Sequence, residues 1–240
     1  MKLSGPIRTL DRFALSLCAL LLTSQIALAQ ATALPALPEP LAAELSAIGR
    51  VGQQWFPSQG CSGTLIAPDL VVTAAHCVAK DGRSTNIFAV GWREGRAITS
   101  RRFKQEIRHP DYAPDGKHNP QNDVALIVLN APITQVAPIP LAQQQGGELA
   151  DGSVALIGYH IQSPDQLAGS LLCPTRDLSP GLVHVACPVV NGNSGGPILG
   201  SNEQGSWEVV GVVSSRIGRG AIAVHASEWL QEQINAHLNR

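Results

Sequence analysis

From residue 51 onward the sequence is built of short apolar runs separated by turn residues, and this pattern limits the fold more than any other feature. Pairs such as Pro68-Asp69, Asp81-Gly82 and Pro180-Gly181 stand between the runs. Short runs with regular turn signals indicate an all-β barrel or sandwich. No helical pattern of convincing length interrupts them, so parallel βαβ units are disfavoured. The runs that we predict as strands are 64–66, 70–72, 124–129, 154–157, 182–185, 209–213 and 221–224.

Two further features divide this strand-rich region. The polar, flexible stretch 143–147 (QQQGG) falls roughly at its middle, so we predict two β units, the first over about 51–142 and the second over about 148–225. A helix is predicted over about 227–239, because Ser227 is a good N-cap residue. Leu230, Ile234 and Leu238 recur at helical spacing, which predicts an apolar stripe that docks on the β core.

The N-terminus has the pattern of a targeting segment. Basic residues precede the apolar run 13–29, which ends in Ala-Leu-Ala, a small-x-small cleavage pattern. We predict a signal peptide over 1–29, with a retained anchor as the alternative, and hence a secreted or periplasmic protein that has no membrane contact once the signal is removed. Residues 30–50 begin with a proline-rich stretch and are predicted as a linker or pro-segment. The formal net charge of −1 argues against nucleic acid as a partner.

Four cysteines remain after the predicted signal is removed. They are Cys61, Cys77, Cys173 and Cys187. An even number in an exported chain indicates two disulfides, with three pairings open, and proximity in the sequence favours 61–77 and 173–187. A zinc site is the competing interpretation, but the usual C-x-x-C spacing is absent. We therefore predict no metal site.

Three motifs carry possible chemistry. The first is 73–77 (TAAHC), which contains His76; the second is 122–126 (NDVAL), which contains Asp123; the third is 191–197 (NGNSGGP), which contains Ser194. A serine hydroxyl is a weak nucleophile at neutral pH and needs a neighbouring base. A histidine suits that role because its unperturbed pKa lies near neutrality, and a buried carboxylate would hold the imidazole in the required tautomer.

Taken together, these motifs resemble the chymotrypsin/trypsin-like serine peptidase family over roughly residues 51–238. The resemblance implies two packed antiparallel β-barrels with a C-terminal α-helix and an active site between the barrels. It also implies a secreted serine endopeptidase that hydrolyses polypeptides through an acyl-enzyme, with no cofactor. The catalytic residues would be His76, Asp123 and Ser194, and the amides of Gly192 and Ser194 would form the oxyanion hole. We expect a monomer.

The resemblance also extends to residues that bind substrate. Ser214, with Ser215 and Arg216 after it, matches the family segment that pairs with the substrate backbone as an added strand. Arg216 and Arg219 would favour an acidic residue before the scissile bond, or else they are solvated loop charges. Val213 stands where glutamyl-specific members usually place a histidine, which weakens the acidic interpretation.

One departure from animal members concerns activation. Asn193 stands where many of them have an aspartate that receives a newly cut N-terminal amine; bacterial glutamyl-endopeptidase-like members share the asparagine. Arg50-Val51 hints at a cleavage point, yet Asn193 has no charge to receive an amine. We therefore predict activity that does not require a free amine at Val51.

Two other functional classes stay open at this stage. A catalytically silent binding protein on the same fold is disfavoured by the intact set of His76, Asp123 and Ser194. An esterase is suggested by Gly192-x-Ser194-x-Gly196, but its usual parallel α/β sheet is not predicted. The remaining histidines form no tight ligand pair and are interpreted as structural or solvated; they are His109, His118, His160, His184, His225 and His237.

Overall fold

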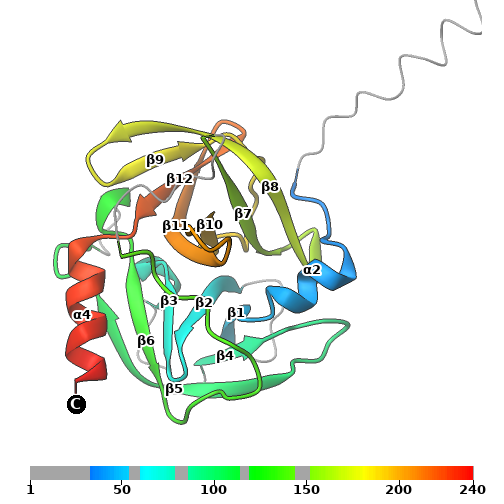
Figure 1. Ribbon diagram of the computed structural model, residues 1–240, viewed down its shortest axis with the longest axis vertical. Helices are drawn as coiled ribbons and strands as arrows, with labels where there is room; N and C mark the ends of the chain where they lie inside the picture. Colours follow the sequence, from blue (N-terminus) through cyan, green and yellow to red (C-terminus); the bar gives the residue numbers. More distant parts are fainter. Residues whose placement is uncertain (1–32, 54–59, 79–85, 114–118, 144–151, 240) are drawn as a thin grey trace, which may run out of the picture. The chain divides into compact units, whose positions relative to one another are not determined.

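The computed structural model describes residues 33–53, 60–78, 86–113, 119–143 and 152–239. The described chain is dominated by antiparallel strands that form two closed barrels (Figure 1). This is the predicted all-β double barrel. The predicted signal peptide at 1–29 lies outside the described residues, as does most of the predicted boundary at 143–147.

The first barrel closes in the order β1-β2-β3-β6-β5-β4. The neighbouring strands β3 and β6 are buried on both faces along their whole length. Closing the sheet leaves no free strand edge, so each strand has two partners. The strands are β1 (Ile48–Gln53), β2 (Cys61–Ala67), β3 (Leu70–Thr73), β4 (Asn86–Val90), β5 (Thr99–Arg108) and β6 (Ala125–Leu129).

The second barrel closes in the order β10-β11-β12-β9-β8-β7. Its long strand β8 forms a tight hairpin with β7 at one end and another with β9 at its other end (Figure 1). The strands are β7 (Ser153–His160), β8 (Ser163–Ser179), β9 (Leu182–Val185), β10 (Pro197–Ser201), β11 (Trp207–Ile217) and β12 (Gly220–His225).

Both barrel cores are filled mainly by aliphatic side chains, as a chain with only 4% aromatic residues requires. Phe88 is the largest of the fully buried side chains, and the next largest are leucines and isoleucines. Branched aliphatic residues pack well on pleated strands. The fold therefore depends on many small contacts rather than on a few aromatic anchors.

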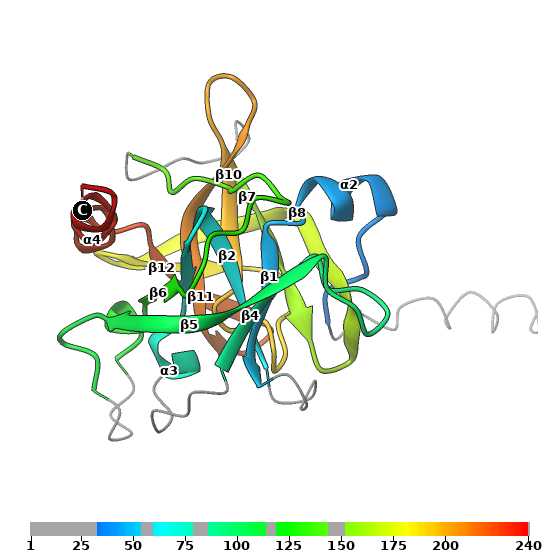
Figure 2. The ribbon, with the colours of Figure 1, turned by 90° about the horizontal axis from the view of Figure 1, so that it is seen from below.

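The C-terminal helix α4 (Glu228–Leu238) lies on the outside of the barrels (Figures 1 and 2). The Ser227 side chain caps it by accepting a hydrogen bond from the Leu230 amide at 3.3 Å. Leu230 and Ile234 are buried against the core, as predicted. Leu238 is 59% exposed, so the buried stripe ends one turn earlier than predicted, at Ile234.

The segment before residue 51 differs from the predicted linker. Leu34, Leu45 and Ile48 are buried, a short helix α2 (Glu39–Glu44) follows the proline-rich stretch, and β1 already begins at Ile48. Buried leucine and isoleucine side chains need a packed surface, which the two barrels supply. The described part of the 30–50 segment is therefore an integral part of the fold.

The possible cleavage point at Arg50-Val51 lies within β1, in the middle of the first barrel. Arg50 and Val51 are registered with β2 on one side and with β4 on the other. A cut there would sever a strand that has two partners. None of the helices in the described ranges combines the length and the apolar character that crossing a membrane requires.

Candidate active site

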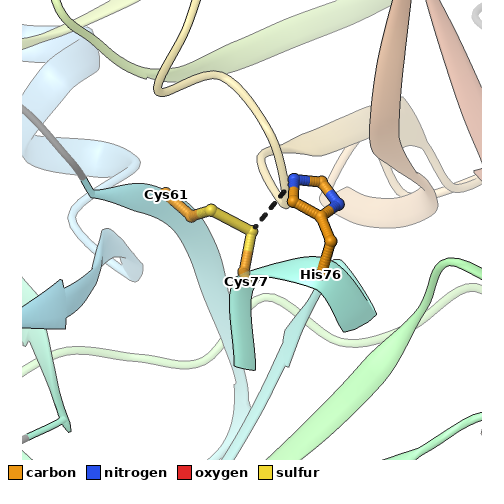
Figure 3. Close-up of side chains that lie close together, drawn as sticks. All are labelled: Cys61, His76 and Cys77. Atoms are coloured by element: carbon orange, nitrogen blue, oxygen red, sulfur yellow. Dashed lines mark hydrogen bonds between the residues drawn. A yellow bond between two sulfur atoms is a disulfide. The ribbon is translucent and has the colours of Figure 1, made fainter. Parts of the chain in front are cut away.

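His76 lies on a single-turn helix, α3 (Ala75–Val78), directly after β3. The disulfide between Cys61 and Cys77 ties this turn to the start of β2, and Figure 3 shows the imidazole of His76 beside it. His76 Nε2 lies 3.7 Å from Cys77 Sγ. Because the two sulfurs are bonded to each other, neither is a thiolate that could bind a metal, although the three side chains cluster closely.

Asp123 approaches the other side of the imidazole, from just before β6. Its Oδ2 lies 2.7 Å from His76 Nδ1, and its Oδ1 accepts a hydrogen bond from the His76 amide at 2.9 Å. An ionised carboxylate can only accept hydrogen bonds, so His76 Nδ1 carries the proton. When only Nδ1 is protonated, Nε2 carries a free lone pair, which is what a general base requires.

The Asp123 carboxylate is fully buried but well supplied with donors. Burial alone raises the pKa of the carboxyl; the hydrogen bond and charge of His76 and the hydrogen bond of Ser214 lower it, and the net pKa is below its usual value. Ser214 Oγ donates to Asp123 Oδ2 at 2.7 Å. Asp123 is therefore an anion at neutral pH, held between one residue of each barrel.

Ser194 comes from the second barrel, in the loop just before β10. Its carbonyl accepts a hydrogen bond from the Ser62 amide in β2 at 2.8 Å, and the Gly195 amide donates to Val213 O at 2.7 Å. Gly195 has a φ of +75°, and a Cβ there would collide with Thr73 Oγ1 and Ser62 O. Only glycine lets the serine-bearing loop come this close to the residues that precede His76.

The Gly192 amide and the Ser194 amide are the donors that the sequence predicts for an oxyanion hole. Neither is a donor in the backbone hydrogen bonds of the described residues, so both can bind an oxygen of a substrate. Gly192 has a φ of +105°, and a Cβ there would lie 2.7 Å from His160 Cα. Glycine is therefore needed at 192 for two reasons, the backbone conformation and the close approach of another segment.

Asn193 lies between these two donors and is 1% exposed. Its Nδ2 donates to Tyr159 O at 3.2 Å, and its Oδ1 accepts from the Val190 amide at 2.9 Å. The side chain thus has both a donor and an acceptor contact within the protein. These two contacts hold the Asn193 side chain against Tyr159 and Val190.

The structure joins His76, Asp123 and Ser214 directly, whereas Ser194 is brought near them through its backbone. Within the described part of the chain no hydrogen bond involves Ser194 Oγ. Contacts between nucleophile and base are often long in an unliganded site and shorten when substrate binds.

Comparison with known proteins agrees with this arrangement. A family model described as a trypsin-like peptidase domain matches residues 61–212, which is more than half of the chain. The chain belongs to the trypsin-like peptidase family. The matched range contains the first-barrel turn with His76, Asp123 and the Ser194 loop, so it spans both barrels.

Individual relatives of this peptidase come from bacteria and from an animal. They are a trypsin of Saccharopolyspora erythraea, 28% identical over 214 residues (74% of this chain, 88% of the relative); a trypsin-like protease of Streptomyces glaucescens, 29% identical over 210 residues (73% and 76%); and the human chymotrypsin-like elastase family member 3A, 27% identical over 221 residues (74% and 79%). With the family, they support serine endopeptidase activity.

The predicted substrate-binding residues of this peptidase lie along the end of β11. Ser214 is buried and stands at a register shift between Val213 and Ser215, where β11 bulges. Ser215 is half-buried, and Arg216 is exposed near the β11–β12 turn. The Ser214 side chain contacts the Asp123 side chain, a role that the sequence prediction did not include.

Sequence reasoning missed Ser62 and Tyr159. Ser62 Oγ donates to Gly192 O at 2.9 Å and accepts from the Tyr159 amide at 2.8 Å, while the Ser62 amide binds Ser194 O. Ser62 thus connects the first barrel to Gly192 and to Ser194, whose amides are the two predicted oxyanion donors. A signal for it is its place immediately after Cys61, the partner of the cysteine next to His76.

Proposed function

We propose that this peptidase is an exported serine endopeptidase that cleaves polypeptides through an acyl-enzyme, with Ser194 as nucleophile, His76 as general base and Asp123 as the group that orients His76. The observation that supports this most directly is the 2.7 Å contact between His76 Nδ1 and buried Asp123 Oδ2, with the Ser194 carbonyl bonded to the Ser62 amide of the same barrel.

In the first step Ser194 Oγ attacks the carbonyl carbon of the scissile bond, while His76 Nε2 takes the hydroxyl proton. The carbonyl oxygen becomes an oxyanion, and the amides of Gly192 and Ser194 donate to it. Such donors contribute several kcal/mol because they are already oriented when the charge develops (about 3–4 kcal/mol for one donor). His76 then gives its proton to the leaving nitrogen, and the C–N bond breaks.

In the second step water hydrolyses the ester on Ser194. His76 Nε2 takes a proton from the water, the hydroxide adds to the acyl carbon, and the proton returns to Ser194 Oγ as the ester bond breaks. The Asp123 carboxylate stays ionised throughout, because its lowered pKa keeps it an anion, and it stabilises each imidazolium that forms.

The polypeptide substrate would pair with the end of β11 as an added strand, as the position of Ser215 and Arg216 near the end of that strand allows. Arg216 is exposed and is available to contact an acidic substrate residue. The two disulfides, Cys61–Cys77 and Cys173–Cys187, fit an oxidising environment and support export.

Blocking the N-terminal amine is expected to leave activity intact. An uncleaved peptide extension at the N-terminus of the mature chain should change kcat/KM by less than about 3-fold, because the Asn193 side chain is already satisfied by Tyr159 O and the Val190 amide. Steady-state assays of extended and unextended chains make the comparison. Activity that appears only after cleavage behind Arg50 would contradict it.

Labelling with a fluorophosphonate probe, together with casein hydrolysis, tests the proposed function. We expect the probe on the peptide that contains Ser194, located by mass spectrometry, and we expect casein to be cleaved. Labelling without proteolysis favours an esterase. No labelling of the folded protein favours a binding protein and ends the proposal.

A further inference from the structure

The oxyanion segment 191–193 lies along the end of β7 and is held there at each residue. Asn193 Nδ2 donates to Tyr159 O at 3.2 Å. The Ile161 amide donates to Asn191 O at 2.8 Å. Between them, the backbone of Gly192 lies directly against that of His160, so that even a Cβ on Gly192 would be 2.7 Å from His160 Cα. The position of the Gly192 amide therefore depends on where residues 159–161 lie.

On the outer side of β8 runs the N-terminal strap, which we define as residues 33–37. Ala36 forms an antiparallel bridge with Ala168, the Leu37 amide donates to Leu167 O at 2.9 Å, and the Gly169 amide donates to Pro35 O at 2.9 Å. The strap is thus a short extra strand on β8 (Figure 1). The Leu34 carbonyl takes no part in this pairing with β8, so it needs another hydrogen-bond donor.

His160 supplies that donor. Its Nε2 lies 3.0 Å from Leu34 O, and the side chain is 4% exposed. A carbonyl only accepts, so the proton is on Nε2. The other ring nitrogen, Nδ1, is buried and has no partner among the described residues. Burial lowers the pKa of His160 more than the bond to Leu34 O raises it, so the ring is neutral.

We propose that His160 is a positioning residue that connects the N-terminal strap to the oxyanion hole. Its imidazole binds the strap at Leu34 O, and its backbone supports Gly192, so docking of the strap holds the Gly192 amide in place. This inference rests on the proposed function. In this arrangement the Leu34 carbonyl and the buried His160 imidazole order the oxyanion segment, and a free N-terminal amine is not required.

The inference predicts that disrupting this connection lowers kcat and changes KM little. Replacing His160 with phenylalanine fills the volume but leaves Leu34 O without a donor. We expect kcat to fall by at least about 10-fold, because a displacement of 1 Å in an active site can cost about 10²-fold in rate. KM should change by less than about 3-fold. His160→Gln keeps an N–H donor and should restore kcat to within about 3-fold of the wild type.

A second histidine provides a matched control. His237 Nε2 lies 3.0 Å from Asp69 Oδ1 and so attaches a terminal element, α4, to the first barrel, away from the oxyanion segment. His237→Phe should lower the melting temperature without lowering kcat. If His160→Phe behaves in the same way, or if His160→Gln does not restore kcat, His160 has only a structural role and the inference is wrong.

The strap can also be loosened without touching His160. Leu37→Pro removes the amide that binds Leu167 O, and it should lower kcat at unchanged KM. Because both substitutions act through one connection, the double variant should be no slower than the slower single variant. Hydrogen exchange at the Gly169 amide reports whether the strap is released. A released strap with wild-type kcat overturns the inference even if His160→Phe does not fold.

These outcomes are separable from failure of the proposed function. If the wild-type protein is not labelled by fluorophosphonate, the serine peptidase mechanism itself fails. If the wild type is labelled and the strap variants are labelled at the same rate, only the role of His160 fails.

Discussion

Replacing Ser194 with alanine is expected to lower kcat for peptide hydrolysis by about 10⁶-fold and to abolish fluorophosphonate labelling. The substitution removes only the oxygen that forms the ester, and the loop keeps its backbone contacts through Ser194 O and the Gly195 amide. The protein should therefore fold normally. Binding of polypeptide substrate should persist, because the end of β11 is unchanged.

The measurement compares kcat, labelling and the thermal transition of the wild type with those of the variant. Ser206→Ala serves as the control, because Ser206 is an exposed serine in the turn between β10 and β11. The control should retain labelling and kcat. Retention of more than about 1% of wild-type kcat by Ser194→Ala would rule out Ser194 as the nucleophile.

Replacing Asp123 with asparagine is expected to lower kcat by about 10⁴-fold at neutral pH. The asparagine amide can donate a hydrogen bond to His76 Nδ1, which moves the ring proton to Nε2. The lone pair is then on the wrong side to accept the Ser194 proton. The volume is unchanged, the amide oxygen at the Oδ1 position can still accept from the His76 amide, and Ser214 Oγ can accept from the second N–H of the new amide, so the loss should arise without unfolding.

A second Asp–His pair in the same protein gives the control. Asp69 lies 3.0 Å from His237 Nε2, a contact of similar length but remote from Ser194. Asp69→Asn should leave kcat within about 2-fold of the wild type, because this pair takes no part in the proposed reaction. Loss of activity in both variants to the same degree would mean that the effect is general destabilisation.

The Asp123 variant also changes the dependence of stability on pH. Because the folded pKa of Asp123 is lowered, its contribution to the free energy of unfolding is present above the unfolded pKa of about 3.9 and is lost as pH falls through the folded value. Denaturant titrations across this acid range should show a shallower decline for Asp123→Asn. An equal decline would show that Asp123 is not paired in the folded state.

Several features of the fold could be read from the residues alone. The apolar runs 64–66, 70–72 and 182–185 lie in strands, and Ser227 caps the final helix. The N-terminal segment could not be read in this way. Three prolines near its start suggested a linker, yet Leu34 and Leu45 are buried, and the backbone of the segment pairs with Leu167 and Gly169, far along the chain. Local composition does not show whether a distant strand offers a surface to pack on.

The candidate site likewise contains residues that the sequence predicted and residues that only the structure revealed. Three sequence motifs, through their resemblance to the chymotrypsin/trypsin-like peptidases, pointed to His76, Asp123 and Ser194 as base, orienting acid and nucleophile. They did not reveal the contact of Ser214 with Asp123 or the place of Ser62 beside Gly192, because serine is common and chemically unremarkable in isolation. Those functions come from proximity between residues 91 and 130 positions apart.

By itself, then, the sequence determined the class of fold and the chemical groups available for catalysis, because strand periodicity, glycine turns and side-chain reactivity are local properties. Only the tertiary structure decided that β1 begins before Arg50, that Asn193 is satisfied internally and that His160 binds Leu34 O. Each of these depends on which distant donors and acceptors meet once water has been excluded between packed strands, and such pairings are properties of the folded chain.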